Sequence, residues 1–360
     1  MQTTRERRKA KDSTPQAPLS SHSAPQIATV RRRKWGTGPF DENWLNVDCC
    51  GLVCAGLTYC LHFYGIYAVC FILIPPWMSS KIDEVRFLSL TGHFHRIIFI
   101  VIAAFACLAH FKAMTTDPGA VPPDASPLEL QEKSAADEEG SELIISQKQK
   151  GRRLCRRCKA FKPQRAHHCS ICRRCIIKMD HHCPWVNNCV GIGNHKFFLL
   201  FIFYTFLSCM YSMTLVVLRF ITCMQKGHPR THHCFDHTTD LLYILGLVIE
   251  SLLFGLFTSC MMFDQWGVVV SNVTHIDKLK GDVGGDRVAG ITEVFGMLRG
   301  TSTAPRLDWF SPFSRVCFPK AINEEIMGYC IPCGSGGNKK SSNVDMTTQG
   351  RMVRSVAEIV

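Results

Sequence analysis

The sequence predicts an all-α integral membrane protein with four transmembrane helices and a small cytosolic Cys- and His-rich domain between the second and third helices. Three observations lead to this fold class. The apolar residues of the 360-residue chain gather in four long windows. A block between the second and third windows carries seven of the twenty cysteines. Lysine and arginine concentrate in the segments on one side of the predicted membrane.

The four apolar windows are each long enough to cross a bilayer, which takes about 20 apolar residues in a helix that rises about 1.5 Å per residue. The first window ends at Pro75-Pro76, and the second has a short apolar core from Ile97 to Ala109. The third and fourth windows are nearly uncharged. The predicted spans are about residues 47–74, 88–111, 197–222 and 241–263.

The basic residues predict the orientation of these spans. Nine Lys or Arg precede the first span, fifteen lie in residues 112–196 and eleven follow residue 263, whereas the loops 76–95 and 223–240 hold two each. Because cytoplasmic loops carry the basic excess, both termini and the central loop are expected in the cytosol. The net charge of +12 therefore fits a membrane surface, and no nucleic-acid partner is expected.

Composition divides the chain into six regions. The N-terminal region is polar with two basic clusters, which predicts a disordered tail, and no apolar signal-peptide core follows its basic start. An acidic, proline-bearing stretch reads as a flexible linker. The regions are a tail (1–43), the first two spans (44–119), the linker (120–150), the Cys-rich domain (151–196), the last two spans (197–263) and a cytosolic tail ordered in patches (264–360).

The Cys-rich block repeats the two-residue gap that zinc knuckles use, at Cys155-x2-Cys158 and again through Cys169, Cys172 and Cys175. It is expected in a reducing cytosol, where structural disulfides are not maintained. It also has few aliphatic residues, so that bound metal must replace a core. Zinc binding follows, because a redox-active CxxC would need a βαβ context that is missing.

The block offers more ligands than two zinc ions use. Two tetrahedral ions take eight ligands, and the candidates are seven cysteines together with His167, His168, His181 and His182. The surplus is expected within Asp180-His181-His182-Cys183, which has the parts of a nucleophile, a base and an orienting carboxylate. A third, incomplete metal site or plain loop residues would give the same pattern.

At these residues the chain resembles the DHHC protein S-acyltransferases, or palmitoyltransferases. The family pattern C-x2-C-x9-HC-x2-C-x2-C-x4-DHHC-x5-C-x4-N-x3-F is met at every position from Cys155 to Phe198. Four spans and Asp117-Pro118-Gly119 after the second span also match, so that the resemblance covers about residues 45–315. The segment NNCVG, the fourth-span stretch Glu250 to Phe263 and the tail WFSPF look like the Golgi-type subgroup, with the endoplasmic reticulum or plasma membrane as alternatives.

The resemblance implies a role for each member of the block. One zinc is expected at Cys155, Cys158, His168 and Cys175, and a second at Cys169, Cys172, His182 and Cys189. Asp180, His181 and Cys183 then form the catalytic set. Cys183 would take a palmitoyl group from palmitoyl-CoA and pass it to cysteines of membrane or membrane-associated proteins, while His181 moves the proton and Asp180 orients the imidazole. Substrate contacts are expected at Trp185 and Ser208, and CoA-phosphate contacts at Arg173, Arg174 and Lys196, with Arg156 and Arg157 as further candidates.

One departure from the family pattern follows the fourth span. The family's T-T-x-E is Thr274-His275-Ile276-Asp277 here, which leaves open what supports Asp180. The alternative function is therefore a catalytically inactive, membrane-anchored zinc interaction module or scaffold.

Two polar residues inside the spans, and two features outside them, complete the sequence predictions. Glu250 lies near the bilayer midplane, where an acid is costly; we expect it to be protonated or to hydrogen-bond Ser212 or Thr214, and to pack the spans together, with a catalytic role as the alternative. The small Ser208 predicts tolerance of acyl chains longer than palmitoyl. The loop 223–240 is expected in the lumen with a Cys223–Cys234 disulfide, and the terminal Glu358-Ile359-Val360 could offer a carboxylate to a PDZ-type partner.

Overall fold

The structure is a computed structural model that describes residues 34–38, 43–82, 85–121, 125, 154–225, 237–281, 284–296 and 306–314. The predicted flexible linker, nearly all of the predicted N-terminal tail, and the C-terminal PDZ-type signal at Glu358 to Val360 lie outside these residues.

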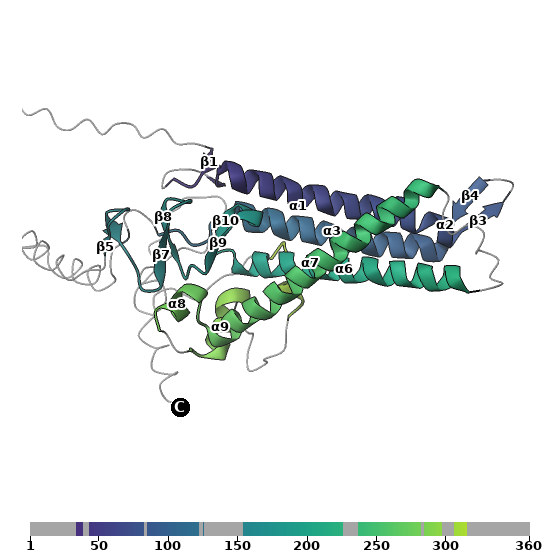
Figure 1. Cartoon of the computed structure of the whole chain (residues 1–360). Helices are drawn as coiled ribbons and strands as arrows, with labels where there is room; N and C mark the ends of the chain where they lie inside the picture. Colours follow the sequence, from purple (N-terminus) through teal and green to yellow (C-terminus); the bar gives the residue numbers. More distant parts are fainter. Residues whose placement is uncertain are drawn as a thin grey trace, which may run out of the picture.

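Four long helices form the body of the molecule, as predicted (Figure 1). They are α1 (Cys49–Tyr67, continued by a π-helix, Ala68–Leu73, and by α2, Pro75–Met78), α3 (Leu90–Thr115), α6 (His195–Met224) and α7 (Thr238–Ser271). Each is long and apolar enough to cross a membrane. α6 packs against both α3 and α7. Large apolar side chains point away from the bundle, among them Val53 and Leu256, at 72% and 70% exposure, as expected of a surface that faces lipid.

The π-helix at the end of the first span is held by two arginines from neighbouring spans. A π-helix breaks the regular hydrogen-bond ladder, so its carbonyl groups need other donors. Arg96 donates to the Cys70 carbonyl at 2.7 Å, and Arg219 donates to the Ile72 and Leu73 carbonyls at 3.1 and 3.0 Å. Nearby, Cys223 in the last turn of α6 is disulfide-bonded, and its expected partner Cys234 lies outside the described residues.

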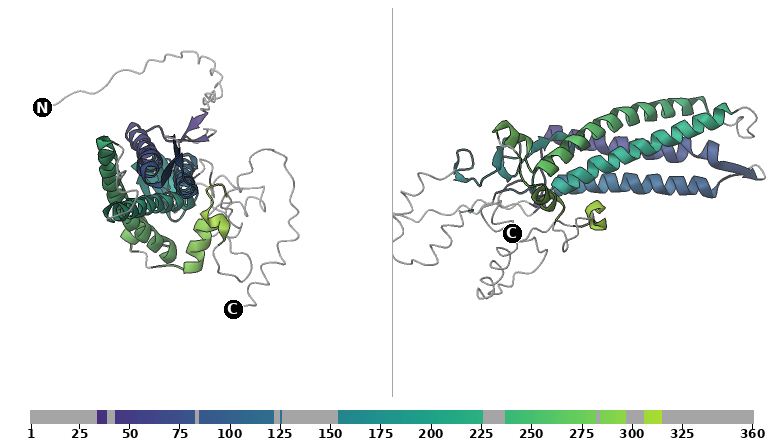
Figure 2. Two further views of the ribbon diagram at one scale, coloured as in Figure 1. Left: turned by 90° about the vertical axis from the view of Figure 1, so that its right-hand side faces the viewer. Right: turned by 90° about the horizontal axis from the view of Figure 1, so that it is seen from below.

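Short β-strands, which the all-α prediction did not include, build the domain at one end of the bundle (Figures 1 and 2). Three antiparallel pairs follow one another: β5–β6, β7–β8 and β9–β10. Their bounds are Leu154–Cys155, Ala160–Phe161, Ala166–Cys169, Arg174–Ile177, His181–Cys183 and Asn188–Val190. A fourth pair, β3 (Ser79–Ile82) with β4 (Val85–Leu88), lies at the other end, and β1 (Trp35–Gly36) pairs with β2 (Asn43–Trp44) ahead of α1.

The Asp117-Pro118-Gly119 motif joins this domain to the end of α3. The Asp117 carboxylate accepts the backbone N–H groups of Gly119 and Ala120 at 2.9 and 2.7 Å, and Gly119 has φ +102°. Its backbone then approaches the Gly191–Gly193 turn so closely that a Cβ on Gly193 would lie 2.2 Å from the Asp117 carbonyl oxygen. Glycine is required there because any side chain would separate the two backbones.

Segments after the fourth span cover the other side of the domain (Figure 1). α7 runs to Ser271, beyond the span end expected at Phe263, and is followed by α8 (His275–Leu279), α9 (Arg287–Phe295) and the 3₁₀ turn Leu307–Phe310. Glu293 of α9 forms a buried ion pair with Lys178 of the Cys-rich domain. This part of the C-terminal region is therefore attached to the domain rather than free.

Candidate functional site

Two groups of cysteine and histidine side chains each bring four potential ligand atoms within 4.8 Å of one another. These groups have the membership that the resemblance implied. We call them the outer group (Cys155, Cys158, His168, Cys175) and the inner group (Cys169, Cys172, His182, Cys189).

The strand pairs explain both memberships. His168 lies directly opposite Cys175 in the β7–β8 pair, and His182 lies opposite Cys189 in the β9–β10 pair. Directly opposed residues of an antiparallel pair have neighbouring side chains, so each hairpin supplies one His and one Cys to a group. Because successive side chains of a strand point to opposite faces, His168 and Cys169 enter different groups, which interlocks the two.

Both groups have the dimensions of a tetrahedral zinc site. Zinc–sulfur bonds of about 2.3 Å place the sulfurs of a tetrahedral site about 3.8 Å apart. The sulfurs of Cys158 and Cys175 are 3.8 Å apart, and those of Cys172 and Cys189 are 3.5 Å apart. Cys158 Sγ is 3.2 Å from His168 Nδ1, and Cys172 Sγ is 3.5 Å from His182 Nδ1. Three cysteines and one histidine are a standard donor set for structural zinc, so the residues fit the ion.

The two groups also form a repeat. Every inner ligand lies fourteen residues after the corresponding outer one: 155 to 169, 158 to 172, 168 to 182 and 175 to 189. The turn of each Cys-x2-Cys pair ends in a residue with positive φ, Lys159 at 53° and Arg173 at 56°. The period was readable in the sequence.

Cys183 begins a third copy of this repeat. It lies fourteen residues after Cys169, and Asn187, fourteen residues after Arg173, again has positive φ, at 47°. The remaining positions that would complete a third metal site hold Val186, Lys196 and Phe203. Cys183 therefore occupies the first position of a zinc-knuckle turn that lacks its other three ligands, which leaves its sulfur available for chemistry.

Asp180 is surrounded by hydrogen-bond donors at 1% exposure. One carboxylate oxygen accepts from His181 Nδ1 at 2.8 Å and from Gln265 Nε2 at 2.9 Å. The other accepts from the His275 backbone N–H at 2.8 Å and from His275 Nδ1 at 2.7 Å. The support that the T-T-x-E departure left open therefore comes from the substituted residue, His275.

These contacts shift the pKa values of the pair. Burial alone would raise the pKa of Asp180, but the donors from His181, His275 and Gln265 outweigh it and hold that pKa well below its usual range. Burial alone would lower the pKa of His181, but hydrogen bonds with Asp180 and Cys183 raise it to about 9. His181 is thus an imidazolium near neutral pH, the form that stabilises negative charge on a neighbouring sulfur.

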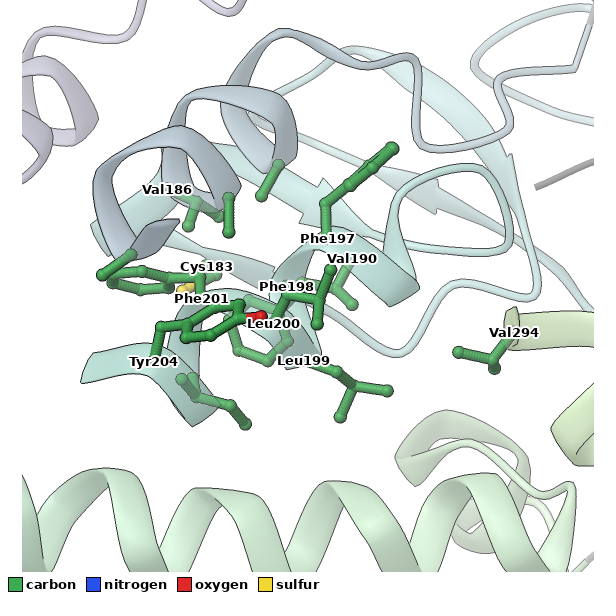
Figure 3. Close-up of a cluster of buried hydrophobic side chains, with 14 of the residues drawn as sticks. Cys183, Val186, Val190, Phe197, Phe198, Leu199, Leu200, Phe201, Tyr204 and Val294 are labelled. Atoms are coloured by element: carbon green, nitrogen blue, oxygen red, sulfur yellow. The ribbon is translucent and has the colours of Figure 1, made fainter. Parts of the chain in front are cut away.

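Cys183 faces the membrane-spanning helices. His181 and Cys183 are alternate residues of β9 and so share a face, while His182 between them points toward the inner metal group. Figure 3 shows the Cys183 sulfur among Phe198 and Phe201. These three residues also line a largely apolar cavity that continues between the spans, with further walls at Trp185, Ile202, Ser208, Leu247, Glu250 and Ser251. The cavity connects the Cys183 sulfur with a space that suits a hydrocarbon chain.

Two supporting residues lie far from the Cys-rich block in sequence. Gln265, fully buried on α7, donates to Asp180, and its Oε1 lies 2.9 Å from His195 Nε2. The sequence reasoning missed Gln265, although a polar residue two positions after the span end expected at Phe263 was a signal. The second, His275, also contacts Asp264 through Nε2 at 2.9 Å.

The basic residues expected at the CoA phosphates have different environments. Arg174 donates to the Val121 carbonyl at 2.8 Å and lies over the Trp44 ring, and the buried Lys196 donates to the Asp308 carbonyl at 2.8 Å. These contacts are structural and do not favour a phosphate role. Arg173 is exposed. A separate polar hollow, which the sequence did not suggest, is lined by Lys162, Arg165 and Lys280.

The expected hydrogen bond between Glu250 and the third span is wrong. Ser212 bonds Ser251 at 2.8 Å, and Thr214 bonds the Met210 carbonyl of its own helix at 2.8 Å. Within the described part of the chain, Glu250 Oε2 is buried without a hydrogen-bond partner. Glu250 lines the cavity instead of joining the two spans.

Comparison with known proteins agrees with this site. The family model described as DHHC palmitoyltransferase matches residues 148–282. "Palmitoyltransferase ZDHHC3-A" of Danio rerio is 37% identical over 272 residues, which cover 75% of this chain and 79% of that protein. "Palmitoyltransferase ZDHHC7" of Mus musculus is 36% identical over 277 residues, covering 76% and 82%. "Probable protein S-acyltransferase 14" of Arabidopsis thaliana is 35% identical over 261 residues, covering 67% and 78%.

Proposed function

The chain belongs to the DHHC palmitoyltransferase family and is a protein S-acyltransferase, and we propose that Cys183 is its nucleophile, His181 its acid–base group and Asp180 the residue that orients His181. The observation that carries this proposal is the chain of contacts from Gln265 and His275 through Asp180 to His181, next to the Cys183 sulfur, which belongs to neither the outer nor the inner metal group. A nucleophile, a base and an orienting carboxylate in contact are the arrangement that covalent acyl transfer requires.

The reaction runs in two balanced steps. The Cys183 thiolate attacks the carbonyl carbon of an acyl-CoA thioester, so that a Cys183 thioester forms and CoA leaves as a thiolate that takes a proton. The thiolate of an acceptor cysteine then attacks the Cys183 thioester, and Cys183 leaves. His181 gives its proton to the leaving CoA thiolate and takes one back from the acceptor thiol, while Asp180 keeps its Nδ1 protonated and its other nitrogen directed at the sulfur. One thioester replaces another, so no further reactant is needed.

The two zinc ions have a structural role in this proposal. The outer and inner groups would each hold one ion with three cysteines and one histidine. Bound zinc replaces the missing core of a small domain. The inner group fixes His182 and Cys189, which flank Cys183 on the β9–β10 hairpin, and so sets the position of the nucleophile.

The two ends of palmitoyl-CoA are assigned to different spaces. The acyl chain would lie in the apolar cavity below Cys183, where each buried methylene contributes about 0.8 kcal/mol. The CoA phosphates would lie in the hollow lined by Lys162 and Lys280, in which Arg165 is already paired with Asp277. Asn272 and Asp277 line the same hollow and flank His275, the residue that contacts Asp180, which supports a route from the hollow to the catalytic residues.

The orientation and compartment are part of the proposal. The basic excess supports a cytosolic location for both termini and the Cys-rich domain. This agrees with a zinc domain that depends on reduced cysteines, and the disulfide of Cys223 at the opposite end of α6 suits a lumenal, oxidising side. The Golgi membrane is the proposed compartment, supported by the subgroup resemblance, and cysteine-bearing proteins at that membrane are the proposed acceptors.

Incubating the purified protein with labelled palmitoyl-CoA tests the proposal. Wild type should form a thioester that hydroxylamine releases, and Cys183→Ser should form none while retaining its zinc. Cys107→Ser, which removes a half-buried cysteine of α3, is the matched control and should label like wild type. Absence of label on a zinc-loaded wild type would support the scaffold alternative, and label on Cys183→Ser would move the nucleophile elsewhere.

A further inference from the structure

The acyl cavity has a polar far end. Among the residues that line the cavity away from Cys183 are Ser212, Ser251 and Glu250 with its carboxyl group. The two serine hydroxyl groups bond each other at 2.8 Å. One oxygen of the carboxyl group differs from them: within the described part of the chain, Glu250 Oε2 is buried and makes no hydrogen bond.

An unpaired carboxyl oxygen in a membrane-spanning segment is costly, and such groups mark functional sites. A hydrogen bond between the spans does not explain the buried carboxyl oxygen of Glu250, because the hydroxyl groups of Ser212 and Thr214 are bonded elsewhere. A ligand that enters the cavity with a hydrogen-bonding group at this depth would satisfy the carboxyl oxygen.

The depth of Glu250 matches the end of a palmitoyl-sized chain. Gln265 contacts Asp180 at the level of the catalytic residues, and Glu250 lies fifteen residues earlier on the same helix, which is about 22 Å at 1.5 Å per residue. An extended chain of sixteen carbons spans about 20 Å, since each bond of about 1.5 Å advances somewhat less along a zigzag. The terminal carbon of such a chain therefore reaches Glu250.

We infer that Glu250 forms a binding site for a polar group at the far end of the acyl chain, so that the enzyme also takes long-chain acyl-CoA bearing a terminal hydroxyl group. The inference rests on the proposed function, because it assumes that the acyl chain of the Cys183 thioester occupies this cavity. The transfer steps are unchanged, and the hydroxyl group only donates a hydrogen bond to the carboxyl group. Glu250 is thus a specificity-determining residue.

Ser208 belongs to the same cavity but not to this end site. Its hydroxyl is also buried without a partner among the described residues. It lies one helical turn before Ser212, about 6 Å nearer to Cys183. A terminal hydroxyl of a sixteen-carbon chain is therefore expected to pass Ser208 and reach Glu250, and Ser208→Ala is an internal control for position.

The test uses the full-length protein in lipid nanodiscs. Four probes are compared: hexadecanoyl-CoA, 16-hydroxyhexadecanoyl-CoA and the shorter pair dodecanoyl-CoA and 12-hydroxydodecanoyl-CoA. The rate of thioester formation on Cys183 is followed by intact mass. Binding is measured separately, by thermal shift, with unreactive ketone analogues in which a methylene group replaces the thioester sulfur. The variants are Glu250→Leu, Glu250→Gln, Ser208→Ala and Thr214→Val, the last a hydroxyl on the exposed side of α6.

The expected result is a loss of preference confined to Glu250 and to the long hydroxylated chain. The ratio of 16-hydroxyhexadecanoyl to hexadecanoyl use should fall about fivefold in Glu250→Leu. It should stay within twofold of wild type in Glu250→Gln, which keeps a hydrogen-bonding group, and in Ser208→Ala and Thr214→Val. For the twelve-carbon pair, whose chains end short of Glu250, the ratio of hydroxylated to plain acyl-CoA use should not change in Glu250→Leu.

An unchanged ratio in Glu250→Leu, in both the rate and the binding measurements, would overturn the inference. A wild type that binds the hydroxylated ketone analogue in a Glu250-dependent way but forms no thioester would support the binding site and count against the proposed function. A wild type that forms the palmitoyl thioester normally and shows no Glu250 dependence would support the proposed function and count against the binding site at Glu250.

Discussion

The outer and inner metal groups share one ligand set and one spacing, yet they differ in what surrounds them. In the outer group both Cys158 and His168 are half-buried, whereas in the inner group only His182 is. The inner group packs with Trp44 and Met179 and sits beneath the strand that carries Cys183. The outer group holds hairpins that carry no catalytic residue.

The outer and inner metal groups therefore perform different tasks, although they repeat one ligand set. The outer group stabilises the domain by joining the β5–β6 and β7–β8 hairpins. The inner group also stabilises the domain. In addition, it sets the direction of the Cys183 side chain, because its ligand His182 alternates with His181 and Cys183 along β9. A shift of one residue in the β9–β10 register would exchange these faces. The inner group is therefore expected to matter more for catalysis.

The largest expected effect compares one ligand from each group. Cys189→Ser should lose one zinc ion and lower thioester formation at least 100-fold, because β9 loses its anchor opposite His182. Cys155→Ser should also lose one zinc ion but lower the rate about tenfold, as for residues that act from outside a site. Zinc content by mass spectrometry and thioester formation by intact mass provide the measurements, and equal rate losses in two folded variants would contradict the comparison.

A smaller effect is expected from the two donors that hold Asp180 at the edge of the inner group. Gln265→Leu removes a buried hydrogen bond to a charged group, worth about 1.5–3 kcal/mol, and should lower the rate about 10- to 100-fold. His275→Thr should stay within about fivefold of wild type, because the His275 backbone N–H remains bound to Asp180. Gln265 is a positioning residue, so its loss should also move the pH profile of the rate. If the pH profile of the rate is unaltered in Gln265→Leu, Gln265 acts by packing rather than by positioning Asp180.

The smallest expected effect comes from a residue of α8. This helix contacts β7, the strand that supplies a ligand to each of the two metal groups. Asp277, at 3% side-chain exposure, pairs with Arg165 at 3.0 Å and contacts His167. Burial alone would raise the pKa of Asp277, but these partners lower it from 3.8 to about 2. Its contribution is therefore fully present above about pH 4, where the unfolded carboxyl group is ionised, and is lost as the pH falls toward 2.

The matching measurement is thermal unfolding of wild type and Asp277→Asn at several pH values. The stability difference between the two should be constant from pH 8 to pH 5. It should shrink by about 1–2 kcal/mol between pH 4 and pH 2. A difference that is independent of pH throughout would show that Asp277 contributes by packing rather than by charge.

The sequence predicted the fold class and metal binding by the Cys-rich block, and the family resemblance implied the membership of both metal groups. Four apolar windows are enough for four spans, because a bilayer accepts only helices of sufficient length. Cysteine and histidine spacing is similarly informative, because a zinc ion requires four ligands at set distances and short hairpins supply them at regular intervals. The fourteen-residue period also belongs to the sequence, and it explains why Cys183 resembles a ligand without a complete site.

Only the tertiary structure decided how the proposed nucleophile, Cys183, is supported and which residues line the cavity beside it. Gln265 and His275 reach Asp180 from segments 85 and 95 residues away in the chain, and no local spacing encodes such a contact. Arg174 and Lys196 were expected to contact the CoA phosphates, but they bind backbone carbonyls once the chain is folded. Glu250 was expected to join two spans and instead faces the acyl cavity, because its side of α7 is decided by how the helices pack rather than by their composition.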